Sequence, residues 1–215
     1  MDRNDDERIE RLKDIYSSGL IYPLIQRDDD GRKPIFVQIK HLNETAFNAC
    51  DVLALSIEIG LHLMEAEETQ IAGLIIIIDC SGCTLRKLKL FSMLQYSTIA
   101  KALNDSIPGR LKGCYLINLP PFAQFLVDII KLTLTKKLQN RVFVLKNLDD
   151  LKYHINYKIL PKEYGGEIPE FLMITDIKGF LNKNDDFMNS SMFQYDLRQI
   201  LKQTNIGTFR ILDND

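Results

Sequence analysis

The chain has 215 residues, 46% of them hydrophobic, so it is long and apolar enough to bury one sizeable core. This excludes a disordered polypeptide and predicts one compact domain, or a domain with short appendages. The longest apolar run, residues 71–78, is far shorter than the ~20 residues that a membrane-spanning helix needs. The charged N-terminus lacks the apolar stretch of a secretory signal, so we expect a soluble, cytoplasmic protein.

The net charge of −2 is distributed unevenly along the sequence. Residues 86–146 carry eleven basic and two acidic side chains, a local balance of +9, whereas the rest of the chain has a balance of −11. Such a segment predicts one positive face for an anionic partner. It lacks interleaved aromatic residues and any zinc-finger or RNP pattern, so we expect an anionic membrane surface and no nucleic acid.

The four cysteines, Cys50, Cys80, Cys83 and Cys114, form no disulfide framework, and the only close pair is Cys80 and Cys83. A structural zinc site needs two further ligands beside that pair, and the three histidines are scattered. We therefore expect reduced thiols, no metal and no cofactor.

Strand and helix signals alternate along the chain, which predicts an α/β layered domain with a largely parallel sheet. The sequence GLIIIID at residues 73–79 is the clearest strand, because a continuous β-branched run is typical of burial on both faces. The expected strands are residues 34–39, 73–79, 113–117 and 142–145. The expected helices are residues 4–18, 45–67, 84–103, 121–137 and, in part, 180–202.

The expected helix 121–137 has an unusual surface. Gln124, Asp128, Lys131 and Thr135 form one narrow polar stripe, and apolar residues flank it on both sides. A surface helix needs an apolar arc of only about 100°, so this helix needs burial on more than one side. One interpretation is a central core helix. The other is a helix with one face on the core and another on a bound apolar ligand or a membrane.

Four motifs in this order resemble the CRAL-TRIO lipid-binding domain family: IPGRLKGCYLIN at 107–118, PPF at 120–122, IIK at 129–131 and LPKEYGG at 160–166. The resemblance implies a mixed, largely parallel sheet that floors an apolar pocket, covered by helices that include a mobile gate at 121–137. It divides the chain into a remnant N-terminal helix (1–20), the lipid-binding domain (21–168) and a C-terminal helical extension and tail (169–215). Of the family's usual N-terminal helical domain we expect only the last helix here, so the chain is either a shortened member or a piece of a longer protein.

The resemblance also implies a function, namely non-catalytic binding and intracellular transfer of a small hydrophobic lipid such as a retinoid or a tocopherol. The expected pocket lining is Phe91, Ile99, Leu103, Phe122, Phe125, Leu126 and Ile129. The residues expected to bind phosphoinositide headgroups are Arg110, Lys112, Lys137 and Arg141. We expect a monomer that associates transiently with phosphoinositide-containing membranes.

Other interpretations of the same residues stay open. Cys80 and Arg86 have the Cys-x5-Arg spacing of cysteine-dependent phosphatases, but Asp79 disfavours a thiolate at Cys80, and Gly82 is the only glycine in the loop. A signalling or scaffold module with a vestigial pocket is a further alternative. The basic residues also fit an ordinary solvated surface.

Overall fold

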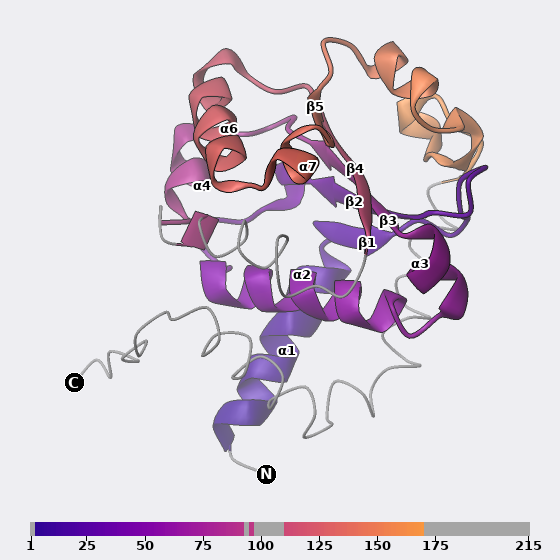
Figure 1. Ribbon diagram of the computed structural model, residues 1–215. Coiled ribbons are helices and arrows are strands. Elements are labelled where there is room, and N and C mark those ends of the chain that lie inside the picture. Colours follow the sequence, from indigo (N-terminus) through magenta and orange to yellow (C-terminus); the bar gives the residue numbers. More distant parts are fainter. Residues whose placement is uncertain (1–2, 93–94, 97–109, 170–215) are drawn as a thin grey trace.

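A computed structural model describes residues 3–92, 95–96 and 110–169 of the chain (Figure 1). A five-stranded sheet lies at the centre, with helices around it. The helices are α1 (Arg3–Ser17), α2 (Ala49–Leu63), α3 (Glu67–Ala72), α4 (Leu85–Lys89), α6 (Pro121–Thr133) and α7 (Lys136–Gln139). The strands are β1 (Ile21–Pro23), β2 (Lys33–Gln38), β3 (Leu74–Asp79), β4 (Leu111–Ile117) and β5 (Val142–Val144). The short 3-10 helices are η1 (Ile39–His41), η3 (Leu148–Tyr153), η4 (Tyr157–Ile159) and η5 (Lys162–Tyr164).

The strands lie in sequence order, β1-β2-β3-β4-β5. β1 pairs with β2 in the antiparallel direction, and all other neighbours are parallel. β3 occupies the centre, as its continuous run of isoleucines favours, because both faces of a central parallel strand are covered. The mixed, largely parallel sheet confirms the expected α/β fold class.

The two faces of the sheet belong to two different apolar clusters. Successive side chains of a strand point to opposite faces. Ile75 and Ile77 are part of a first, larger cluster, whereas Ile76 and Ile78 pack against a second, smaller one. In the parallel pairing Ile78 lies beside Leu116 of β4, another member of the second cluster. Figure 1 shows α4 and α6 on one side of the sheet and the η3–η5 segment on the other.

The first cluster is a closed core built from α1, α2, the sheet and the segment 148–168. α1 contributes Leu12, Ile15 and Tyr16, each at most 1% exposed. Arg11 of α1 also donates a hydrogen bond of 2.9 Å from Nε to Oδ2 of Asp51 in α2. Packing and this ion pair together fix the two helices to each other.

All four expected strands are confirmed, with ends within two residues of the prediction, and the expected helix 4–18 is α1. The expected helix 45–67 begins later, at Ala49, because Asn48 caps it: the Asn48 side chain accepts a hydrogen bond of 2.8 Å from the Asp51 amide. It also ends earlier, at Leu63, and α3 follows as a separate helix.

Two expected helices are corrected by the structure. In the helix expected at 84–103, α4 ends at Lys89 and residues 95–96 are again helical, whereas 93–94 and 97–103 lie outside the described residues. The helix expected at 121–137 is broken into α6 and α7, because Leu134 has an extended backbone with ψ 152°. Leu134 and Leu138, on either side of the break, are both buried in the second cluster. The expected helix 180–202 lies outside the described residues.

Candidate functional site

The chain enters α6 through a fixed turn. Pro120 is the N-cap in an extended conformation and Pro121 is the first helical residue, where proline has no helical hydrogen bond to lose. Asn118 has a left-handed backbone with φ 54°, which asparagine tolerates better than most residues. Its side-chain amide donates a hydrogen bond of 2.8 Å to Oδ1 of Asp79 at the end of β3. The end of β3 therefore holds the root of α6.

The inner side of α6 makes few contacts. Ala123 is the only buried residue of the helix. Val127, four residues later, packs against the second cluster. Lys131, four residues after Val127, donates a hydrogen bond of 3.2 Å from Nζ to the backbone oxygen of Val142 in β5. This spacing of four defines the side of the helix that faces the sheet.

The outer side of α6 is apolar and exposed. Phe122, Phe125 and Leu132 are 47%, 73% and 79% exposed. The nearby polar side chains of Gln124 and Asp128 are hydrogen-bonded to each other at 2.9 Å. Large apolar side chains gathered on one exposed helix face indicate an interaction surface. The polar stripe seen in the sequence thus separates the inner and outer sides, and Lys131 turns inward from it.

The sheet face below α6 and α7 is apolar and only partly covered. Ile76 and Ile78 of the central strand are half-buried, although their neighbours Ile75 and Ile77 on the opposite face are completely buried. The buried members of the second cluster are Cys80, Leu111, Cys114, Leu116, Leu134 and Leu138. Incomplete coverage at the centre of a parallel sheet is unusual, because such strands are normally covered on both faces.

The thiols of this region are unreactive in character. Burial raises the pKa of Cys80 to about 12, and the neighbouring Cys83, Asp79 and Cys114 add to the rise. The thiol therefore stays protonated at neutral pH. Arg86 lies on the surface beside Glu44, at 3.8 Å, with a side chain that is 71% exposed. This arrangement disfavours a phosphatase built on these two residues.

Within the described part of the chain, no group of His, Cys, Asp and Glu side chains is arranged to hold a metal ion.

A buried polar network links the two sides of the sheet at the end of β3. Asp79 accepts hydrogen bonds from the Tyr164 hydroxyl at 2.6 Å, from Asn118 at 2.8 Å and from the Ser81 amide at 2.9 Å. Burial alone would raise the pKa of Asp79, but these hydrogen bonds outweigh it and lower the pKa below its ordinary value. Gln38 extends the network by donating to Tyr164 at 3.2 Å. The sequence did not reveal this network, because Tyr164 lies 85 residues away from Asp79 along the chain.

Three of the four expected headgroup-binding residues lie together at the beginning of β4 and β5. Arg110 directly precedes β4, Lys112 lies within it, and Arg141 directly precedes the neighbouring β5. Arg141 donates a hydrogen bond from its guanidinium to the backbone oxygen of Leu111. Lys137 is exposed on α7, which ends shortly before Arg141.

The start of β4 is irregular next to Lys112. Leu74 of β3 lies beside Leu111 of β4, and Ile75 lies beside Gly113. The β3–β4 pairing therefore skips Lys112. Gly73, with φ +92°, allows this close approach: a Cβ atom there would lie 2.3 Å from the Arg110 oxygen.

The described residues of the expected pocket lining fall into two groups. Phe122 and Phe125 are exposed, whereas Leu126 and Ile129 of the same helix are half-buried. Phe91 is half-buried and packs against the first cluster, with its ring 5.6 Å from that of Tyr96. The other two residues, Ile99 and Leu103, lie outside the described residues.

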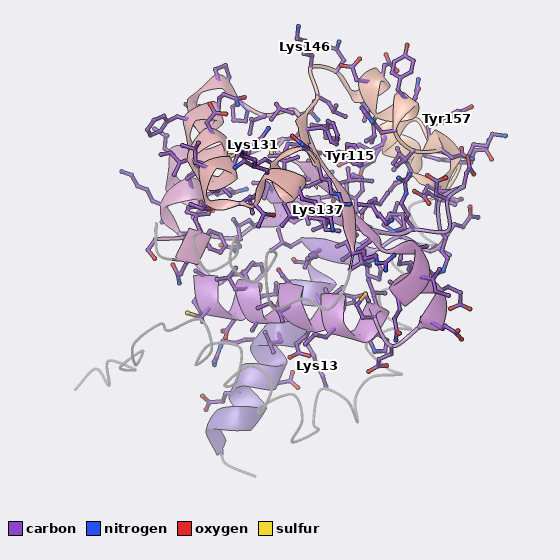
Figure 2. The ribbon with its side chains drawn as sticks, in the orientation of Figure 1. Lys13, Tyr115, Lys131, Lys137, Lys146 and Tyr157 are labelled. Atoms are coloured by element: carbon purple, nitrogen blue, oxygen red, sulfur yellow. The ribbon has the colours of Figure 1, made fainter. Side chains whose placement is uncertain are left out.

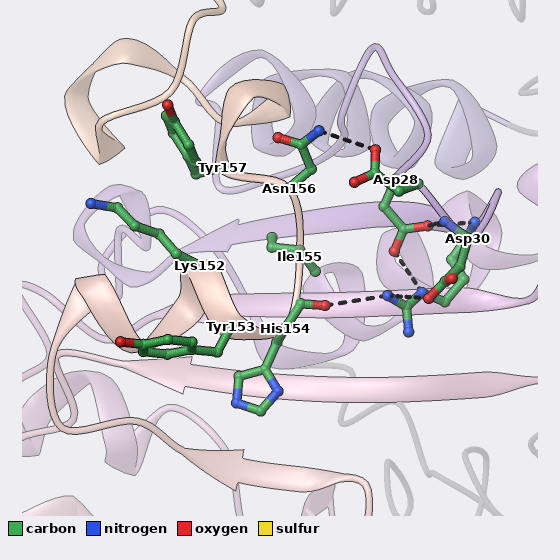
Figure 3. Close-up of a pocket in the computed structure, with 10 residues that line it drawn as sticks. Asp28, Asp30, Lys152, Tyr153, His154, Ile155, Asn156 and Tyr157 are labelled. Carbon is green, nitrogen blue, oxygen red and sulfur yellow. Dashed lines mark hydrogen bonds and ion pairs between the residues drawn. The ribbon is translucent and has the colours of Figure 1, made fainter.

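A polar cleft of about 520 Å³ lies between the β1–β2 turn and the η3–η4 segment (Figure 3). Its charged groups have partners in the protein: Arg32 contacts Asp28 and Asp30 and donates to the His154 backbone oxygen at 3.3 Å. Asn156 donates to Asp29 at 3.0 Å. The sequence indicated only a turn here, because the cleft depends on contacts between segments more than 100 residues apart.

Comparisons with known proteins agree with this geometry. The family model described as CRAL/TRIO domain matches residues 17–166. The human alpha-tocopherol transfer protein-like protein is 29% identical over 181 residues, which cover 82% of this chain and 52% of that protein. Clavesin-1 of Xenopus laevis is 31% identical over 188 residues, covering 84% of this chain and 56% of its own length. The crystal structure of Sfh5 superimposes with a TM-score of 0.54 at 18% identity, covering 69% of this chain and 54% of that chain. The chain thus spans about half the length of the curated relatives it matches.

Proposed function

Because the chain belongs to the CRAL/TRIO domain family, we propose that it binds a small hydrophobic lipid and carries it between membranes without chemical turnover. The observation that carries this proposal is the layer formed by α6 and the sheet. An amphipathic helix with one buried residue lies over a sheet face whose central isoleucines are only half-buried. A relative named for tocopherol transfer supports the same class of ligand.

The lipid would lie between α6 and the second apolar cluster. Ile76, Ile78 and Leu116 offer it an apolar floor. Burial of apolar surface is favourable by roughly 25 cal/mol per Å², enough for submicromolar affinity without a polar anchor. The expected lining on the helices, which is Phe91, Ile99, Leu103, Phe122, Phe125, Leu126 and Ile129, stays a prediction. In the structure Leu126 and Ile129 are half-buried, whereas Phe122 and Phe125 lie on the outer side of α6 and Phe91 packs against the first cluster.

α6 would act as the gate of this site. The backbone is extended on both sides of the helix, with ψ 147° at Pro120 and 152° at Leu134. A rigid helix between two extended hinges can move as a unit, because only the hinge dihedrals need to change. The small buried area of α6 keeps the free energy of such a movement low.

Docking on a membrane would use the outer side of α6 together with the basic residues. Phe125 and Leu132 would enter the apolar boundary of the membrane, where their burial is favourable. Arg110, Lys112, Lys137 and Arg141 would contact phosphoinositide headgroups. Each basic residue near an anionic surface contributes about 1 kcal/mol, less at physiological salt. We propose a cytoplasmic monomer that associates transiently with such membranes.

A vesicle assay tests this function. Donor vesicles carry a quenched fluorescent tocopherol or a fluorescent phosphatidylcholine, and acceptor vesicles carry neither probe. We expect transfer of at least one probe to accelerate in proportion to protein concentration. If the protein accelerates neither probe and also purifies from cells without a bound lipid, the proposal is wrong.

A further inference from the structure

The polar cleft between the β1–β2 turn and the η3–η4 segment is separate from the proposed lipid site. Tyr157 at the start of η4 lies on the opposite side of the molecule from Lys131 of α6 (Figure 2). The volume of the cleft, about 520 Å³, is within the range of small-ligand sites. Four of its lining residues have exposed side chains that carry a charge or an aromatic ring and lie outside the Arg32 ion pairs. They are Asp29, Lys152, Tyr153 and Tyr157.

The cleft already holds a cation against an aromatic ring. The Lys152 ammonium lies 5.6 Å from the centre of the Tyr157 ring, which is a cation–π distance (Figure 3). The same ammonium contacts Asp149 at 2.6 Å, and the two side chains are 46% and 81% exposed. Exposed ion pairs of this kind contribute little to stability, so Lys152 can leave the ring at low cost. The face of Tyr157 is therefore a place for a cation that the protein itself occupies only loosely.

Asp29 supplies a negative charge beside that ring. Its Oδ1 accepts a hydrogen bond of 3.0 Å from the Asn156 side chain, which holds the carboxylate against the segment that carries Tyr157. The other two carboxylates of the turn, Asp28 and Asp30, are both paired with Arg32. Among the residues that the structure describes, no cationic side chain forms an ion pair with Asp29. Asp29 is thus the carboxylate of this turn that can pair with a cation from outside.

We propose that the cleft binds an arginine side chain of a partner protein, which stacks on Tyr157 in place of Lys152 and pairs with Asp29. Arginine fits this arrangement better than lysine, because its planar guanidinium both stacks on aromatic rings and forms two parallel hydrogen bonds with a carboxylate. Tyr153 is 87% exposed and extends the surface beyond the cleft. Tyrosine is enriched in protein–protein contacts, which favours a protein as the source of the arginine. This inference goes beyond lipid binding and does not depend on it.

A titration followed by NMR tests the site. The probe is the tripeptide acetyl-Gly-Arg-Gly-amide, and the control is the same peptide with citrulline, which keeps the shape of arginine but has no charge. We expect the arginine peptide to give saturable shifts of the backbone amides of residues 28–32 and 152–157. The citrulline peptide should leave them in place. Equal shifts with both peptides, or shifts by the arginine peptide only outside these two segments, would overturn the proposal.

Exposed residues of the cleft allow variants that keep the fold, which the amide spectrum of each variant verifies. Asp29→Asn and Tyr157→Leu should each weaken binding of the arginine peptide about tenfold or less, whereas Tyr157→Phe should bind like the parent. Lys152→Met should bind the peptide about threefold more tightly, because it removes the competing ammonium.

Lys158→Met is the matched control, since it removes an equal charge from the same segment outside the cleft. It should bind the arginine peptide like the parent. Unchanged or weaker binding by Lys152→Met, or parental binding by Asp29→Asn and Tyr157→Leu, would overturn the proposal.

Discussion

The two faces of the central sheet differ in how completely they are covered. On the first face, Phe36, Ile75 and Ile77 are fully buried by α1, α2 and the segment 148–168. On the second face, Ile76 and Ile78 of the same central strand stay half-buried beneath a helix with one buried residue. A closed, densely packed face stabilises the fold, and we propose that the half-buried face is where the lipid binds. One strand would then contribute alternate residues to stability and to lipid binding.

The largest expected difference is between two phenylalanine positions. Phe36→Asp places an unpaired carboxylate in the closed core and should cost about 4 kcal/mol or more, which unfolds the chain. Phe125→Asp changes a side chain that is 73% exposed and should cost about 0.5 kcal/mol or less, yet abolish lipid binding. Urea unfolding and lipid binding measure the two effects. Equal destabilisation by both variants would support the core-helix interpretation of α6.

The thiols give the next largest contrast. Because burial and neighbouring groups raise the pKa of Cys80 from 9.0 to about 12, its thiolate at pH 7 is roughly a thousandfold rarer than for an ordinary thiol. Alkylation by iodoacetamide, followed by mass spectrometry, should modify the exposed Cys50 and leave Cys80 intact. If iodoacetamide modifies Cys80 rapidly and added phosphate prevents this modification, the phosphatase interpretation is supported instead.

Neighbouring isoleucines on β3 sharpen the comparison. Ile77→Ala removes a fully buried side chain and should destabilise the protein by about 2–5 kcal/mol. Ile78→Ala, on the half-buried face, should cost about 1 kcal/mol, because its side chain has fewer neighbours to lose. Urea unfolding of both variants measures the difference. If Ile78→Ala is as costly as Ile77→Ala, the second face is as closed as the first.

The smallest expected effect concerns membrane docking. Reversing Arg110 and Lys112 to glutamate should weaken binding to phosphoinositide liposomes by roughly ten- to a hundredfold. The same reversal at Lys158 and Lys162, exposed on the other side of the sheet, is the control and should weaken binding much less. Liposome sedimentation across a salt series measures both. If both reversals weaken binding equally, or if binding by the parent does not depend on the salt concentration, Arg110 and Lys112 are part of an ordinary solvated surface.

Four of the five strands and the family were predictable from the sequence because their signals are local, whereas the three-residue β1 was not predicted. The isoleucine run of β3 and the ordered motifs around β4 and α6 need no knowledge of distant contacts. The Asn48 cap of α2 is a local signal too, because an asparagine three residues before Asp51 can accept a hydrogen bond from the Asp51 amide. With it, the start of α2 was predictable to the residue.

The break between α6 and α7 was not predictable, because helical periodicity continues through it. Leu134 leaves the helical conformation to bury its side chain beside Leu138, and only the folded structure reveals that packing. The hydrogen bond of Lys131 and the network at Asp79 were not predictable for the same reason. Their partners, Val142 and Tyr164, are 11 and 85 residues away along the chain.

The most direct test of a ligand site on the half-buried face is native mass spectrometry of the protein purified from eukaryotic cells. The parent should carry one lipid of defined mass. Ile78→Phe, which enlarges a side chain on the half-buried face of β3, should retain the fold and lose that lipid, whereas the surface variant Lys136→Met should keep it. A parent that carries no lipid, or an Ile78→Phe variant that retains the same lipid, would contradict the account.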